Sequence, residues 1–288
     1  MERILPARSP HGLGAAGAGL RAALGKFFRD RGTHLAAMIA YYALLSFFPL
    51  VFLALALLGL AGRADESSYV VTELGRAFPG ASIASIVKAV RTVQDNATTL
   101  GIVGGVALLW ASLSLFSVLE SAFNIVYDRP NRPFLRGKAL AIVFMTTSLV
   151  VLFVGLLAGS IGFDVLKRYA AGFAGNSVVA YALSVVISAA AVFAFLFSAY
   201  YRLTNTKLTL REVLPGAIVA ALGLESSFQV LPVYLRLSNN VPAAQAFGGP
   251  VILLVWLYVM AIVIVFGAEV NYELARRGRE DSSVLGLA

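Results

Sequence analysis

Six long apolar segments alternate with shorter polar stretches along the chain. Each segment approaches or exceeds the roughly 20 residues that an α-helix needs to cross the hydrocarbon core of a membrane. The segments cover residues 35–61, 100–126, 139–162, 177–201, 213–235 and 247–272. The pattern predicts an all-α, polytopic membrane protein whose bundle of six transmembrane helices forms one domain over residues 35–272.

Two amphipathic stretches outside these segments predict short surface helices. In the basic N-terminal tail, residues 1–34, one helical face carries Leu20, Leu24, Phe27 and Phe28. This face suits a helix in the headgroup layer of the membrane and equally a helix packed on the end of the bundle. The external loop, residues 62–99, has a similar face made of Ile83, Ile86, Val87 and Val90. Residues 273–288 form a C-terminal tail.

Composition agrees with a membrane protein and excludes several kinds of chemistry. Of the 288 residues, 59% are hydrophobic and 13% are charged, about half the charged share of a soluble domain. The chain has no cysteine, and its two histidines are His11 and His34. It contains no phosphate-binding loop, nucleophile elbow or H-E-x-x-H motif. We therefore predict no catalytic site, no metal site and no cofactor, and a protein that is not an enzyme.

The basic residues indicate the orientation in the membrane. All 23 Lys and Arg residues lie outside the six apolar segments, with 16 in the two tails and the loops on their side and 7 in the other loops. By the positive-inside rule, both termini are cytoplasmic. Because the positive charge marks loops at a membrane surface, it suits anionic lipid headgroups and does not predict a nucleic-acid partner.

Polar side chains inside the apolar segments are the best pointers to function, because they are costly in lipid. Glu225 lies roughly 18 Å along a helix starting near Val213, close to the membrane midplane, where a carboxylate costs about 2.5–3.5 kcal/mol. Gln229 extends the same face. Two interpretations stay open: an acid lining a cavity, such as a proton site, and a glutamate hydrogen-bonded between helices.

A second polar stripe runs along the segment 100–126. Its members are Ser117, Glu120, Ser121 and Asn124, at helical spacing. We favour a structural ion pair between Glu120 and a loop arginine, namely Arg129, Arg132 or Arg136, over direct contact with a substrate. With Tyr42 of the first segment, the candidate cavity residues are Glu225, Gln229, Ser117, Glu120, Asn124 and Tyr42.

Several short stretches together resemble the YihY / virulence factor BrkB family of bacterial inner-membrane proteins, over roughly residues 25–275. They are Ala40-Tyr41-Tyr42-Ala43-Leu44-Leu45-Ser46-Phe47-Phe48-Pro49-Leu50, Ala122-Phe123-Asn124-Ile125-Val126-Tyr127, Leu214-Pro215-Gly216-Ala217, Phe247-Gly248-Gly249-Pro250, Trp256-Leu257-Tyr258 and Gly267-Ala268-Glu269-Val270-Asn271. The chain departs from the family in having Phe247 before Gly248, where Tyr is usual, and Leu115-Phe116-Ser117 where an Arg is frequent. The resemblance implies six transmembrane helices in the inner membrane, in agreement with the hydropathy pattern.

The resemblance does not imply one activity, since members have been named ribonuclease BN and linked to serum resistance and lipid transport. The dispersed acidic residues disfavour a nuclease, which needs clustered metal ligands. We expect a secondary transporter or flippase-like protein for a lipid or amphipathic anion, with membrane lipids as partners. The alternative is a non-transporting envelope protein whose polar stripes hold the bundle together. The sequence does not indicate an oligomeric state.

Overall fold

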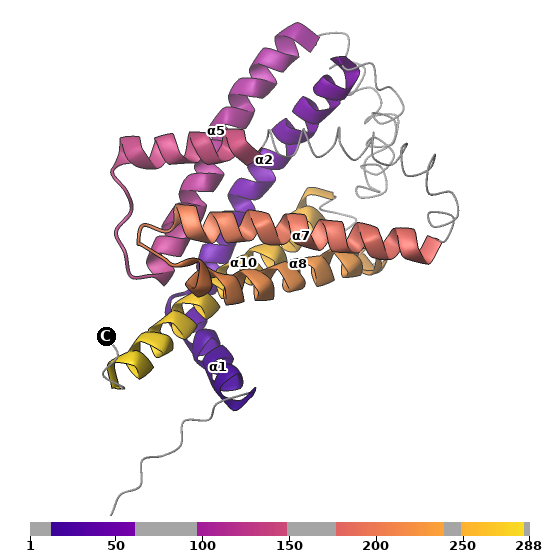
Figure 1. Cartoon of the computed structure of the whole chain (residues 1–288). Coiled ribbons are helices and arrows are strands. Elements are labelled where there is room, and N and C mark those ends of the chain that lie inside the picture. The colour runs from indigo at the N-terminus through magenta and orange to yellow at the C-terminus, as the bar shows by residue number, and fades with distance from the viewer. Residues whose placement is uncertain (1–12, 61–96, 149–176, 239–248, 285–288) are drawn as a thin grey trace, which may run out of the picture.

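In the computed structural model, residues 13–60, 97–148, 177–238 and 249–284 are described (Figure 1). Their helices are α1 (Leu13–Arg29), α2 (Gly32–Leu60), α5 (Ala97–Val126), α7 (Ser177–Leu203), α8 (Leu210–Ser238) and α10 (Gly249–Val284). Residues 134–148 are also helical, and no strand occurs in these ranges. The all-helical class is therefore confirmed for the described part of the chain.

Three of the described helices contain stretches long and apolar enough to cross a membrane. These stretches are Val185–Leu203, Leu210–Val230 and Val251–Arg279, and shorter apolar helical stretches cover Gly32–Phe47 and Leu113–Val126. The predicted segment 139–162 begins within the helical residues 134–148 and continues outside the described residues. The predicted surface helix of the external loop, with Ile83, Ile86, Val87 and Val90, also lies outside them.

The last helix is longer than the hydropathy pattern predicts. It continues past residue 272 to Val284, so much of the C-terminal tail is helical. Glu273 pairs with Arg276 one turn later, at 3.0 Å, and Arg279 reaches Glu212 at the start of α8, at 2.6 Å. Ion pairs of this kind stabilise a polar helix that hydropathy alone cannot detect.

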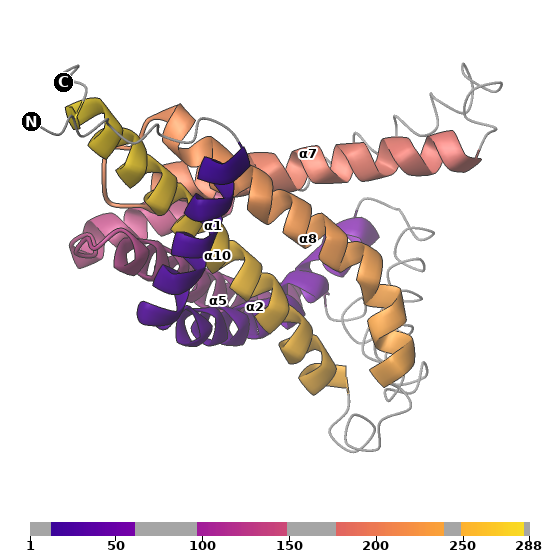
Figure 2. The same ribbon diagram turned by 90° about the horizontal axis from the view of Figure 1, so that it is seen from below.

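Helix α10 lies at the centre of the arrangement. It packs against α8 on one side and α2 on the other, α7 packs against α8, and α5 packs against α2. Figure 1 shows α2 and α5 side by side, crossing the pair α7 and α8 steeply. Figure 2 shows α1 lying across α10.

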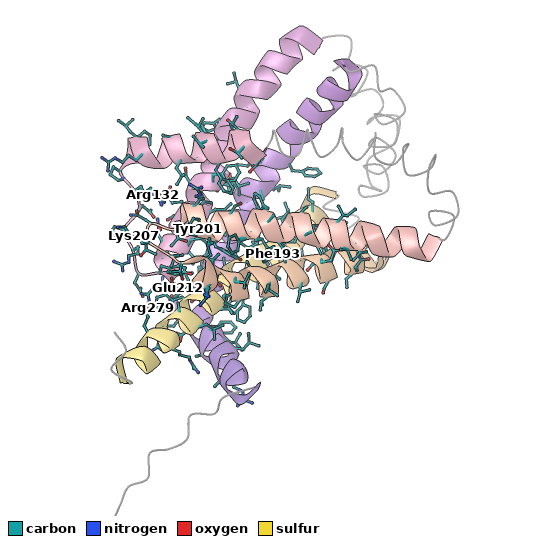
Figure 3. All side chains as sticks on the ribbon, viewed as in Figure 1. Arg132, Phe193, Tyr201, Lys207, Glu212 and Arg279 are labelled. Atoms are coloured by element: carbon teal, nitrogen blue, oxygen red, sulfur yellow. The ribbon has the colours of Figure 1, made fainter. Side chains whose placement is uncertain are left out.

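The loops after α5 and after α7 meet the C-terminal part of α10 at one end of the bundle. We call this end, made of residues 127–136, 204–212 and 273–284, the basic end. Figure 3 shows Arg132, Lys207, Glu212 and Arg279 gathered there. The side chain of Asn205 donates to the carbonyl of Pro130 at 2.9 Å and so joins the two loops.

The end of α5 is set by its backbone conformation. Asp128 has a positive φ of 51°, in the left-handed region. Its N–H donates to the carbonyl of Ile125 at 3.1 Å, and the N–H of Arg129 donates to the carbonyl of Asn124 at 2.8 Å. This pair of bonds is a Schellman motif, which ends the helix and turns the chain into the loop.

Close contact between α8 and α10 depends on two glycines. A Cβ atom on Gly267 would lie 2.8 Å from the carbonyl oxygen of Gly216 and 2.5 Å from the hydroxyl of Tyr200. The room left by the missing glycine side chains is occupied by two hydrogen-bonding groups. Asn271 Oδ1 accepts from the N–H of Gly216 at 2.6 Å, and Tyr200 donates to the carbonyl of Ile264 at 2.7 Å. Several motif residues that carry the family resemblance thus form a helix contact.

Helix α1 has two apolar faces with different surroundings. Ala23 and Phe27 are buried, and the Phe27 ring lies 6.3 Å from that of Phe266 in α10. Leu20, Leu24 and Phe28 are 45%, 49% and 64% exposed. The helix therefore packs on the bundle and also presents an apolar row to its surroundings, so the single apolar face predicted from the sequence is divided.

Candidate functional site

Glu225 is buried between two helices, with 8% of its surface exposed. Its Oε2 accepts a hydrogen bond from Ser188 Oγ of α7 at 3.0 Å. Its Oε1 accepts one from Gln229 Nε2 of the same helix, α8, at 2.9 Å. We call these three residues the Glu225 site. The acid thus has a polar partner from another helix, while Gln229 itself is exposed.

The other predicted cavity residues lie on the other pair of helices, α2 and α5. Ser117 of α5 accepts a hydrogen bond from Lys138 at 2.9 Å and donates to the carbonyl of Leu113 at 2.6 Å. Tyr42 of α2 is half-buried, and its carbonyl accepts a hydrogen bond from Ser46 at 2.6 Å. The structure therefore divides the predicted residues into separate groups instead of one cavity.

Glu120 pairs with a loop arginine, as the sequence predicts, and the partner is Arg132. The Arg132 guanidinium donates to Glu120 Oε1 at 3.0 Å. It also donates to the carbonyls of Arg202, Leu203 and Thr204 at the end of α7, at 3.2, 2.5 and 2.9 Å. Arg132 therefore joins α5 to the C-terminal carbonyls of α7, where a cation is favourable.

Asn124 has a similar linking role beside this pair. It is fully buried, its Nδ2 donates to Asn131 at 3.0 Å, and its Oδ1 accepts from the backbone N–H of Asn205 at 2.7 Å. Asn131 in turn donates to Ser121 at 3.2 Å. The polar stripe of α5 thus holds the two loops of the basic end against each other.

A buried ion cluster, which the sequence did not predict, lies where α1 meets α10. We call Lys26, Asp30, Glu269 and Tyr272 the Lys26 cluster. The Lys26 ammonium is ion-paired with Asp30, lies 3.3 Å from Glu269 Oε2 and 4.3 Å from the centre of the Tyr272 ring, and donates to the carbonyl of Val126 at 2.7 Å. Lys26 and Glu269 are 3% and 0% exposed, so both groups of this pair are buried.

The local sequence does not predict this cluster, because Lys26 lies in a short basic helix and is expected there to face solvent. Its burial depends on contact with Glu269 and Tyr272, which lie more than 200 positions further along the chain. The visible signal was the group Glu269, Asn271 and Glu273 at the end of an apolar segment, where three polar residues need partners.

Electrostatics hold Lys26 in its charged form. Burial acts to lower the pKa of the ammonium, but the hydrogen bond to Asp30 and the charges of Glu269, Asp30 and Asp128 outweigh it, so the pKa is raised above its ordinary value. Tyr127, just beyond α5, has its pKa raised, first by burial and then by the charges of Glu212 and Glu269. Its hydroxyl is buried and has no hydrogen-bond partner among the described residues.

A pocket of about 600 Å³ opens beside the Lys26 cluster. Its charged lining consists of Lys26, Arg29, Asp30, Asp128, Glu273 and Arg276, with Tyr272 forming part of the wall. Basic and acidic groups are equally represented, so the pocket is polar without a strong net charge. Among the described residues, no group of three or more His, Asp or Glu side chains is placed to hold a metal ion.

Comparisons with known proteins give one consistent family. The model of the family described as virulence factor BrkB matches residues 23–285. The chain is 28% identical to the putative ribonuclease-like protein YfkH of Bacillus subtilis over 90% of this chain and 95% of that protein. It is 28% identical to a UPF0761 membrane protein of Pseudoalteromonas atlantica, over 88% of this chain and 85% of that one.

A UPF0761 membrane protein of Chlorobium phaeobacteroides is 26% identical over 91% of this chain and 62% of its own length. No solved structure matches the chain. The family match covers most of the chain and includes the glycine contact between α8 and α10, the Glu225 site and the Lys26 cluster. The protein is an integral membrane protein that belongs to the virulence factor BrkB family.

Proposed function

We propose that this protein is a secondary transporter or flippase-like protein that moves a lipid or an amphipathic anion across the bacterial inner membrane. It does so without enzymatic chemistry, through six transmembrane helices with both termini in the cytoplasm. The apolar stretches within α7, α8 and α10 and the names of its relatives as membrane proteins support its place in a membrane.

The observation that carries the proposal is the Glu225 site. A carboxylate within an apolar helix is expensive in lipid, and here Ser188 and Gln229 each satisfy one of its oxygens. Gln229 is exposed on α8. Polar groups therefore continue from the buried acid to the outside of the helix pair, where a passing headgroup can exchange hydrogen bonds with them.

Charge at the basic end supports an anionic substrate. Arg129, Arg136 and Arg211 are exposed, and such residues attract anionic headgroups at the inner leaflet of a membrane. Arg132 does not belong to this group, because its guanidinium is bound to Glu120 and to carbonyls of α7. The headgroup contacts are assigned to the three exposed arginines.

The competing interpretation is that the same hydrogen bonds only hold the bundle together. Purified protein in vesicles of phosphatidylethanolamine and phosphatidylglycerol separates the two functions. Fluorescent phosphatidylglycerol in the inner leaflet becomes accessible to an external quencher only if the protein moves it. We expect protein-dependent movement of the lipid. In Glu225→Gln, we expect the rate to fall about tenfold, which corresponds to about 1.4 kcal/mol of barrier.

The matched control is Ser226→Ala. Ser226 is the neighbouring exposed polar residue, and its hydroxyl donates to its own helix at the carbonyl of Leu222, at 2.7 Å. This variant should move lipid about as fast as the parent. Vesicles without any protein-dependent movement, together with RNA cleavage that survives purification, would favour a nuclease of the kind for which the Bacillus subtilis relative is named.

A further inference from the structure

Two carboxylates compete for one ammonium in the Lys26 cluster. Lys26 gives hydrogen bonds to Asp30 and to the carbonyl of Val126, and it lies over the ring of Tyr272. Glu269 is within ion-pair distance of Lys26 at 3.3 Å, but neither of its oxygens has a hydrogen-bond partner in the described part of the chain. The donors of Lys26 are therefore directed at other groups.

The charges of this cluster do not balance if every group is ionised. One cation and two anions leave a net charge of −1 around a glutamate that is 0% exposed. A buried carboxylate without hydrogen-bond donors is among the least favourable groups in a protein interior, and it is normally neutralised. A single proton would make the cluster neutral.

Among the described residues, the neighbouring elements offer no second cation for Glu269. The charges that act on it are those of Lys26 and Asp30 from α1 and the segment after it, and of Glu273 from α10. Glu273 is paired with Arg276, and Glu212 of α8 is paired with Arg279. Tyr127, just beyond α5, interacts electrostatically with Glu269. His34, the histidine of α2, is exposed beside Thr33.

We propose that Glu269 is a proton-binding site, which holds a proton at neutral pH because Asp30 takes the shared ammonium of Lys26. Glu269 then has a hydroxyl hydrogen to donate. The buried hydroxyl of Tyr127, which interacts electrostatically with Glu269, has no hydrogen-bond partner among the residues that the structure describes. The proton site does not rest on the transport proposed above, because it is defined by charge and burial alone.

The pocket beside the cluster gives the proton a route to solvent. Lys26 and Asp30 line it, and Glu273 and Asp128 add carboxylates to its wall. Asp30 is 15% exposed at its side chain, whereas that of Glu269 is at 0%. A proton from solvent therefore meets the pocket carboxylates first and reaches Glu269 behind them.

Infrared spectroscopy of the whole protein in vesicles tests the site without any measurement of lipid movement. A protonated carboxyl group has its own C=O stretching band, which shifts in deuterated water. We expect the spectrum of the parent minus that of Glu269→Gln to show this band at neutral pH. Because glutamine has nearly the shape of the protonated acid, the variant should fold and unfold at nearly the same temperature as the parent.

Two further variants make the test specific. Glu120→Gln removes a carboxylate that is paired with Arg132, and its difference spectrum should lack the protonated band at neutral pH. In Asp30→Asn, Lys26 no longer pairs with Asp30 and becomes the partner of Glu269. Glu269 should then be ionised, so the band of the protonated acid should be lost at neutral pH. An absent band in the Glu269→Gln difference spectrum, or a band that Asp30→Asn leaves unchanged, would overturn the proposal.

Discussion

The guanidinium of Arg132 lies 3.0 Å from the carboxylate of Glu120 and joins two helices that are separate in the sequence. Glu120 belongs to α5, and the remaining donors of Arg132 bind carbonyls at the end of α7. A planar guanidinium can serve several acceptors at once, which an ammonium group cannot do in the same geometry. This residue is therefore a structural link at the basic end.

Replacement of Arg132 should destabilise the protein. In Arg132→Gln, the buried Glu120 loses its partner and the α7 carbonyls lose their donors, which should lower the free energy of unfolding by about 3 kcal/mol. Arg132→Lys should recover only part of this loss. Thermal unfolding in detergent measures both, with the exposed Arg136→Gln as the control. An unfolding temperature equal to that of the parent would contradict the structural role.

Gly267 should not tolerate a larger residue. In Gly267→Ala, the new methyl group meets the hydroxyl of Tyr200 and the carbonyl of Gly216, so the variant should be destabilised by about 1–3 kcal/mol. Gly278→Ala in the same helix is the matched control, because a Cβ there meets nothing within 4 Å. That control should be as stable as the parent or more stable by about 0.5–1 kcal/mol.

The exposed row of α1 should lie against lipid. Because the chain has no cysteine, Leu24→Cys provides a single attachment point for an environment-sensitive fluorophore. Its emission should shift to that of an apolar environment when the protein is in vesicles, and a quencher in the lipid headgroup layer should reduce it. The same label at the exposed Gly278, in the polar C-terminal part of α10, gives the aqueous reference. Equal emission at the two positions would show that α1 does not touch the membrane.

The asymmetry of basic residues predicts the orientation. Reporter proteins fused after Ala288 or inserted near Arg132 should be active on the cytoplasmic side, and a reporter near Asn96 should be active outside. The fusions are compared in cells at matched expression. A cytoplasmic signal near Asn96 would reverse the orientation proposed here.

Hydropathy alone was sufficient to predict helices α2, α5, α7, α8 and α10, because an apolar stretch of about 20 residues in a membrane protein has few alternatives to a helix. It failed at the end of α10, which continues to Val284 through polar residues. There the helix is held by pairs such as that between Arg279 and Glu212. A contact between two helices cannot be detected from the hydropathy of either helix.

For the polar residues, the sequence determined which side chains in the apolar segments needed a partner. The tertiary structure decided which residue each partner is. Glu120 and Glu225 were identified because a carboxylate in an apolar segment is costly. That Arg132 and Ser188 would meet them, and that Lys26 would be buried against Glu269, depends on how α1, α7 and α10 pack. Electrostatic pairing acts over a few ångströms in space, and residues far apart along the chain reach that distance only after the helices have packed.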